Sequence, residues 1–263
     1  MVKSAILLKM EWLTSIRYKV NFFGTSFSVV VAMLPVLIML FYKDISFFGF
    51  ESGLEYSMYL VIANAYWCIV ESFWDFTFVM RNKMREGILE DTMMLPMNTV
   101  QFILGWAAGG IVQAIMQACP LFLLALIVVG KKGITTCLVI VGIEVISSIT
   151  SFSIAYMLVA IMLYWNEADQ VVSMMANITP LLCGLLVPVT NLPISLKCIS
   201  CVFPFSWALD LIRFYYCGLN TLFPIGLEWC IFFVLMAVYF GLGIYVYRKL
   251  LKKARKDGTF GRY

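Results

Sequence analysis

Long apolar runs alternate with short charged segments along the chain. Each run is uncharged or nearly so, and each is long enough for a helix to cross about 30 Å of hydrocarbon at about 1.5 Å per residue. The pattern therefore predicts an all-α integral membrane protein, with one transmembrane domain over residues 1–263. The six predicted transmembrane helices are residues 20–42, 57–80, 100–129, 134–165, 170–189 and 222–247.

The two chain ends carry a different pattern. Over residues 1–19, apolar side chains recur at helical spacing and basic ones fall mostly elsewhere around the helix, which predicts an interfacial helix with Trp12 and Tyr18 as anchors. Residues 248–263 form a basic tail that indicates an anchor for anionic lipids rather than a nucleic-acid surface.

Residues 81–99 lie between the second and third apolar runs and carry dense charges of both signs. Each such charge costs about 2.5 kcal/mol or more in hydrocarbon, so the segment is predicted to be a polar loop. Ile88, Leu89 and the apolar residues up to Pro96 would form the ridge of a short amphipathic helix that docks on a partner. A solvated connecting loop is the alternative reading of the same spacing.

Residues 190–221, between the fifth and sixth runs, are apolar but broken by prolines into pieces too short to cross a membrane. Irregular backbone survives at membrane depth where it is buried in protein or lines a cavity. Two short re-entrant helices in the outer leaflet would meet that demand. Asp210 and Arg213 are three residues apart on one of them, which predicts a local ion pair.

Composition and charge support a membrane protein and exclude several other classes. The chain is 62% hydrophobic and 13% charged, whereas soluble domains run near a quarter charged. Histidine is absent, which excludes histidine-based catalysis and histidine metal sites. Gly130–Lys131 lacks the upstream glycine of a phosphate-binding loop. We therefore predict no catalytic residue, metal or cofactor in this chain.

The distribution of charge predicts the orientation. Most of the 19 lysines and arginines fall before the first run, in the loop at 81–99 or after the last run. The positive-inside tendency then places both termini and that loop in the cytoplasm, in a multi-pass protein of the plasma (cytoplasmic) membrane.

Two further sets of residues could carry chemistry. Cys198 and Cys201 form the one suggestive pair among eight cysteines, as a weak metal signal or as a disulfide on an oxidising side of the membrane. Glu71, Asp75 and Glu144 are predicted to lie at membrane depth, where carboxylates usually mark a pathway. For Asp75 we favour a pairing with nearby arginines; for Glu71 both readings stay open, and for Glu144 we favour a pathway.

Two segments resemble the ABC type-2 permease family. Glu86-Gly87-x-Leu89-Glu90 followed by Pro96 resembles the coupling-helix signature of that family, with an isoleucine in place of its usual threonine. The coupling residues that the resemblance implies are Arg85, Glu86, Gly87, Ile88, Leu89, Glu90 and Pro96. The second segment, LLVPVTNLPISLKCISCVFPFSWALDLIR, resembles the family's pattern at Pro188, Leu192, Pro193, Pro204, Ala208, Asp210 and Arg213.

The resemblance implies the membrane subunit of an ATP-driven exporter. A separate ABC ATPase subunit, which binds the ATP and Mg, would dock on the loop and the N-terminal helix. A second copy or a similar permease would complete the pore, with the first and fifth spans at the interface. The aromatic content of 16% suggests a lipophilic or amphipathic substrate, such as a drug, an antimicrobial peptide or a lipid-linked glycan. An ion-coupled secondary transporter and a non-transporting scaffold or immunity protein are the alternatives.

Overall fold

The computed structural model describes residues 50, 53–85, 134–165 and 168–257, together with isolated positions between 9 and 31 and between 114 and 123. Apart from those isolated positions, the predicted interfacial helix and the first and third spans lie outside the described residues, as do residues 86–99 of the predicted loop. The labelled elements are all helices: α4 (Gly53–Arg85), α7 (Ile134–Tyr164), α8 (Ala168–Leu182), η2 (Val189–Asn191), α9 (Ile194–Ser200), α10 (Pro204–Cys217) and α11 (Ile225–Asp257).

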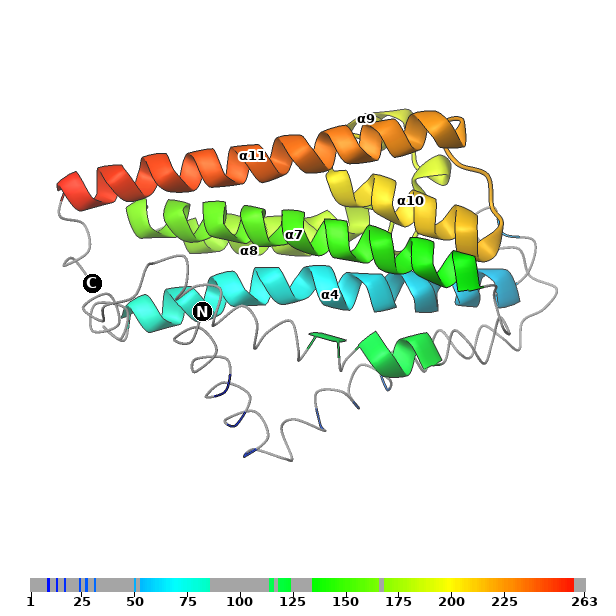
Figure 1. Ribbon diagram of the computed structural model, residues 1–263, viewed down its shortest axis with the longest axis horizontal. Coiled ribbons are helices and arrows are strands. Elements are labelled where there is room, and N and C mark those ends of the chain that lie inside the picture. Colours follow the sequence, from blue (N-terminus) through cyan, green and yellow to red (C-terminus); the bar gives the residue numbers. More distant parts are fainter. Residues whose placement is uncertain are drawn as a thin grey trace.

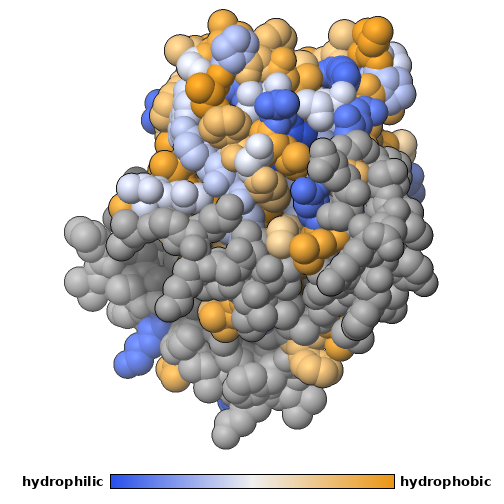
Figure 2. Space-filling view, turned by 90° about the vertical axis from the view of Figure 1, so that its right-hand side faces the viewer, coloured by the Kyte–Doolittle hydropathy of each residue, from blue (hydrophilic) through white to orange (hydrophobic). Residues whose placement is uncertain are grey.

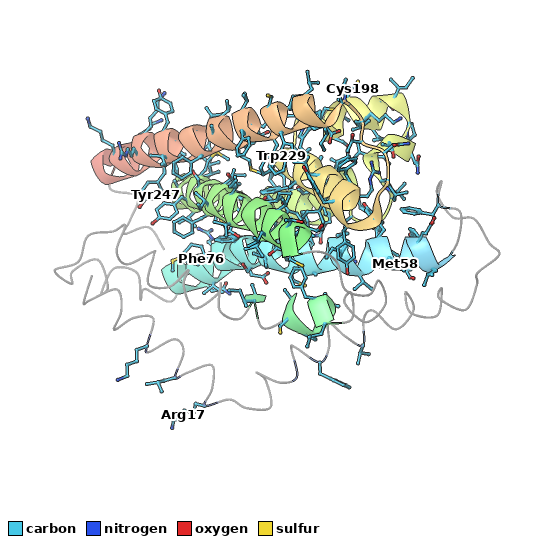
Figure 3. All side chains as sticks on the ribbon, turned by 45° about the vertical axis from the view of Figure 1, so that its right-hand side comes forward. Arg17, Met58, Phe76, Cys198, Trp229 and Tyr247 are labelled. Carbon is cyan, nitrogen blue, oxygen red and sulfur yellow. The ribbon has the colours of Figure 1, made fainter. Side chains whose placement is uncertain are left out.

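The long helices form a bundle with one irregular end. In Figure 1, α4, α7 and α11 run in the same direction, α8 runs against them, and η2, α9 and α10 gather where the three long helices begin. We call residues 183–224, which contain these three short helices, the end cap. Figure 3 shows Met58 of α4 and Cys198 of α9 toward the cap, whereas Tyr247 of α11 lies toward the opposite end. This alternation of direction is the one that the sequence predicts for the second, fourth, fifth and sixth spans.

Within the part of the chain that the structure describes, two helices are long and apolar enough to cross a membrane, Thr135–Met162 and Ile225–Leu250, and a third crossing is available if α9 and α10 count as one bent span. α8 has 15 residues, so it reaches about 22 Å and falls short of the hydrocarbon thickness. α4 is long, but most of its side chains are buried inside the bundle and it is less apolar than α7 and α11.

The helix bounds agree with the sequence prediction for one span and differ for three. α7 matches the predicted 134–165 almost residue for residue. α8 ends at Leu182, seven residues earlier than predicted, because Gly184 just beyond it adopts a positive φ that does not continue a helix. α11 continues through the basic tail to Asp257, and α4 continues to Arg85, past the predicted start of the polar loop.

Aromatic side chains fill the spaces between the helices. Phe73 of α4 and Phe152 of α7 meet edge to face with ring centroids 6.0 Å apart, and Trp67 and Phe205 join α4 to α10 at 6.4 Å. Such pairs contribute about 0.5–1.5 kcal/mol each beyond the apolar area that they bury. The bundle therefore holds together through bulky interdigitated side chains around α4 and α7.

Arg81 shows how a charge is accommodated between helices. The sequence places this arginine in the polar loop, whereas the structure buries it near the end of α4, where its guanidinium donates to the Met162 carbonyl at 3.1 Å. Met162 lies in the last turn of α7, where carbonyl groups lack partners within the helix. The negative end of that helix dipole stabilises the buried cation.

Candidate functional site

The end cap begins where α8 stops and the chain loses regular structure. The Cys183 N–H still donates to the Thr179 carbonyl at 2.8 Å, and the Leu185 N–H donates back to the Pro180 carbonyl at 3.0 Å, where Gly184 adopts a φ of +88° and ends the helix. A side chain there would be strained, and its Cβ would lie 2.9 Å from the Val189 Cγ2 atom. The chain then forms η2, α9 and α10, and α10 is bent from α9 by 103°.

Prolines explain these breaks. Pro193 precedes the first residue of α9 with an extended ψ of 151°, and Pro204 occupies the first turn of α10, where its missing N–H costs nothing. α10 ends at Gly218, whose φ of +76° lets its N–H reach the Phe214 carbonyl at 3.0 Å. The prediction that this segment is broken into short helices is thereby confirmed.

Side chains of neighbouring helices satisfy the carbonyl groups that the breaks leave without helical partners. The Tyr59 hydroxyl of α4 donates to the Gly184 carbonyl, and the Tyr56 hydroxyl donates to the Leu186 carbonyl at 3.2 Å. From α9, Ser200 donates to the Leu182 carbonyl at 2.5 Å. These bonds matter because an unpaired buried carbonyl costs several kcal/mol in a membrane.

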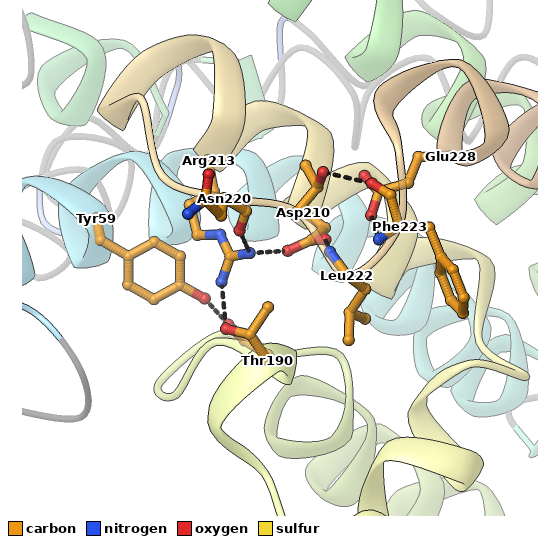
Figure 4. A network of polar contacts seen from close by, with 10 residues as sticks. Tyr59, Thr190, Asp210, Arg213, Asn220, Leu222, Phe223 and Glu228 are labelled. Atoms are coloured by element: carbon orange, nitrogen blue, oxygen red, sulfur yellow. Dashed lines mark hydrogen bonds and ion pairs between the residues drawn. The ribbon is translucent and has the colours of Figure 1, made fainter.

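A buried charged network joins α10 to the rest of the cap (Figure 4). Arg213 forms an ion pair with Asp210, and both side chains are almost fully buried. The Arg213 guanidinium also donates to the Thr190 hydroxyl at 3.0 Å and to the Asn220 carbonyl at 2.6 Å. The predicted pair is confirmed, and its hydrogen bonds tie η2 and the segment before α11 to α10.

A second carboxyl group completes this network. The Leu222 N–H donates to Asp210 at 3.0 Å, and the Phe223 N–H donates to Glu228 at 3.1 Å. Glu228 is fully buried in the first turn of α11, and its carboxyl group is hydrogen-bonded to that of Asp210 (Figure 4). The two acids thus bind consecutive backbone N–H groups just before α11 begins.

The network holds the fold together and leaves little room for a ligand. Tyr59, Cys183, Pro188, Asp210 and Arg213 surround one space that does not admit a water molecule. The outer surface of this end is mixed, with hydrophilic side chains among hydrophobic ones in the part that Figure 2 colours. We therefore interpret the network as a clamp that fixes the cap to α4 and α11.

The structure places the remaining residues of the predicted re-entrant motif in the same cap. Leu192 ends η2, and Ala208 is fully buried in α10 against the bundle core. Pro188 borders the space around Arg213. Of the predicted coupling residues, Arg85 is the last residue of α4, and the others lie outside the described residues.

The predicted pathway carboxylates do not come together. Glu71 and Asp75 are exposed on α4, whereas Glu144 is partly buried on α7 within electrostatic reach of Tyr66. Glu71 is five residues beyond Tyr66 on the same helix, so it points to a different side. Among the described residues, no group of three or more His, Cys, Asp or Glu side chains could hold a metal ion, and Cys198 and Cys201 are free thiols.

Sequence reasoning missed Glu228, Tyr59, Thr190 and Asn220. A signal existed for Glu228, since it is an acidic residue inside the predicted span 222–247. The argument that a carboxyl group at membrane depth marks a functional position, used for Glu71 and Glu144, applies to it as well. Tyr59, Thr190 and Asn220 have no local signal, because their partners lie 7 to 125 residues away in the sequence.

Comparison with known proteins gave no match to any family model and no significant similarity to a curated protein.

Proposed function

We propose that this chain is the permease subunit of an ATP-driven exporter of the ABC type-2 class. The observation that carries the proposal is the end cap. The residues of the second motif form a bent pair of short helices, and the Asp210–Arg213 pair within it bonds to η2 and to the segment just before α11. A capped end of this kind suits a protein that must close one side of a membrane pathway.

The arrangement of the helices supports the same proposal. Four of the six proposed spans correspond to α4, α7, α8 and α11, whose relative directions are those of a six-span chain with both termini on one side of the membrane. The cap would then face outward. The ATPase subunit, which binds the ATP and Mg, would dock at the opposite end, on the loop at 81–99 and the N-terminal helix.

In the proposed mechanism, the helix bundle transmits a movement from the ATPase subunits to the end cap. Closure of the ATPase subunits would shift the pore, formed with a second or similar permease, between two states through contacts that differ between them. The Tyr59 side chain links α4 to the cap, and the Arg213 side chain links α10 to η2 within the cap. A displacement of α4 at its cytoplasmic end would therefore reach the cap, and a lipophilic or amphipathic cargo would leave on the outer side.

Affinity purification of the chain from its native membrane tests the proposal. We expect a soluble ATPase to co-purify, with ATP hydrolysis, and to be lost when Glu86, Gly87 and Leu89 are replaced together. Replacement of the exposed cap residues Ile194, Leu196 and Ile199 by alanine is the matched control and should leave the complex intact. A chain that purifies alone under mild detergent, with its spans intact, would contradict the proposal.

An ion-coupled secondary transporter is the second candidate, because Glu144 places a carboxyl group in the interior of the bundle. It predicts transport that follows a proton or sodium gradient and needs no ATPase. Transport assays in vesicles with and without ATP separate the two candidates.

A further inference from the structure

A polar cluster lies between α4 and α7, away from the end cap. It consists of Tyr66 of α4 with Glu144 and Ser147 of α7, and we call it the α4–α7 polar cluster. Glu144 and Ser147 are three residues apart and share a face of the helix. Tyr66 packs in the bundle core against Ile140 and Ile143 of α7, and its hydroxyl lies beside Ser147 and within electrostatic reach of Glu144.

The three oxygen atoms of this cluster are buried. The Tyr66 and Ser147 hydroxyls lie within hydrogen-bonding reach of each other, but neither they nor the Glu144 Oε1 atom makes a well-formed hydrogen bond to a residue that the structure describes. Tyr66 and Ser147 are 1% and 0% exposed. Leaving such buried groups without a hydrogen-bond partner is energetically unfavourable.

Ser147 differs in this respect from the hydroxyls around it. Ser148, Thr150 and Ser151 each donate to the carbonyl four residues earlier on α7, at distances of 2.7 to 3.2 Å. A serine in a helix satisfies itself in this way without any tertiary partner. The Ser147 hydroxyl does not, and it remains oriented toward the interface with α4.

One member of the cluster, Glu144, is partly exposed on the surface of α7, although its Oε1 atom is buried. Glu144 is half-buried, and Val141 and Val145 beside it on α7 are 54% and 53% exposed. A molecule with an apolar tail on these valines could therefore place a polar head on the carboxylate. Charge complementarity selects a cation for that head, since the cluster holds one carboxyl group and no basic side chain.

We infer that the α4–α7 polar cluster binds the primary ammonium group of an amphipathic molecule. A primary ammonium carries three N–H donors and one positive charge, and the cluster offers two hydroxyl oxygens and one carboxyl group. Charge-assisted hydrogen bonds to such a group are about twice as strong as neutral ones. The role of this site rests on the proposed export function, in which the bound molecule would be the exported substrate.

Binding of radiolabelled dodecylamine, which is protonated at neutral pH, tests the inference on the full chain in lipid nanodiscs, with empty nanodiscs subtracted. Wild-type protein should bind it saturably. Glu144→Gln should weaken binding by about tenfold or more, and Tyr66→Phe and Ser147→Ala should each weaken it several-fold. Glu71→Gln, which changes an exposed carboxyl group on α4, is the matched control and should bind as wild type.

Competitors identify the group that is recognised. Dodecanol lacks the charge and should not displace the probe, and dodecyltrimethylammonium lacks N–H donors and should displace it more weakly than unlabelled dodecylamine. Equal binding to the wild type and to Glu144→Gln, with both proteins monodisperse on gel filtration, would overturn the inference. Displacement by millimolar NaCl or KCl, or equal displacement by the trimethyl compound, would also overturn it.

The assay needs no ATPase, so the two proposals fail separately. If the chain purifies without an ATPase but binds the probe saturably and through Glu144, the exporter proposal is refuted and the ammonium site is supported. An ATPase-coupled chain without such binding would sink the ammonium site alone.

Discussion

Three buried polar side chains bond to the irregular backbone of the end cap. Tyr59, Arg213 and Glu228 each bond to a backbone group of the end cap that no helix satisfies. A hydrogen bond to a charged group contributes about 1.5–3 kcal/mol, and the penalty for losing one partner is larger because the other partner stays buried. Changes to these residues should therefore act on the stability of the cap.

Asp210→Asn should destabilise the fold by about 3–5 kcal/mol, the usual cost of breaking a buried ion pair by removing one charge. The Arg213 guanidinium would remain buried without its ion-pair partner. Denaturant unfolding in mixed micelles, followed by circular dichroism, measures the change. Asp75→Asn makes the same chemical change at an exposed position and should alter the unfolding free energy by less than about 0.5 kcal/mol. Equal stability of Asp210→Asn and wild type would show that the clamp is not structural.

At the scale of the helices, the crossing of α7 and α11 depends on a glycine. A Cβ atom built on Gly243 would overlap the carbonyl and hydroxyl groups of Ser153, so the two backbones touch at this point. The Ser153 hydroxyl donates to the Phe240 carbonyl at 2.7 Å, and the Tyr156 and Tyr247 rings meet with centroids 4.8 Å apart. Close backbone approach, a hydrogen bond and an aromatic pair together fix the register of these helices.

Gly243→Ala should therefore destabilise the bundle by about 1–3 kcal/mol, as overpacking of a well-packed contact does. Gly241→Ala is the matched control on the same helix, since nothing lies within 4 Å of its Cβ position. The control should be neutral, or more stable by up to about 1 kcal/mol, because alanine favours helix over glycine. Thermal unfolding of the two variants in the same detergent gives the comparison, and a loss of stability in both would point to helix flexibility instead of packing.

At the scale of the whole molecule, the two ends differ in character. At the end opposite the cap, Arg81 binds a carbonyl in the last turn of α7, and the Lys253 ammonium lies 4.5 Å from the centroid of the Tyr164 ring. Both cations sit at the C-terminus of α7, where the helix dipole is negative. The cap end instead holds its charges in the internal network of Asp210, Arg213 and Glu228.

The proposed orientation can be tested with a membrane-impermeant maleimide on intact cells. In a variant that retains Cys198 as its single cysteine, this exposed residue of the cap should be labelled from outside. A cysteine introduced at Lys252 in a cysteine-free variant should be labelled after permeabilisation alone, because Lys252 is exposed at the opposite end. The reverse result would invert the topology and place the proposed ATPase surface outside the cell.

Several features follow from the sequence because their causes are local. The bounds of α7 come from an apolar run ended by polar residues, and the Asp210–Arg213 pair comes from the i, i+3 spacing. The end of α10 follows from Gly218, which alone among common residues takes a positive φ without strain. Each of these depends on neighbours within a few positions, so pattern and propensity suffice.

Other features were decided by contacts between distant parts of the chain. The sequence by itself determined an apolar helical protein with a proline-broken segment, because transfer of each residue to hydrocarbon depends mainly on that residue. The tertiary structure alone decided that Arg81 is buried on α7, that Glu228 joins the clamp and that Tyr66, Glu144 and Ser147 meet. The physical reason is that a buried polar group needs a hydrogen-bond or ion-pair partner. Helix packing supplies that partner from a distant part of the chain.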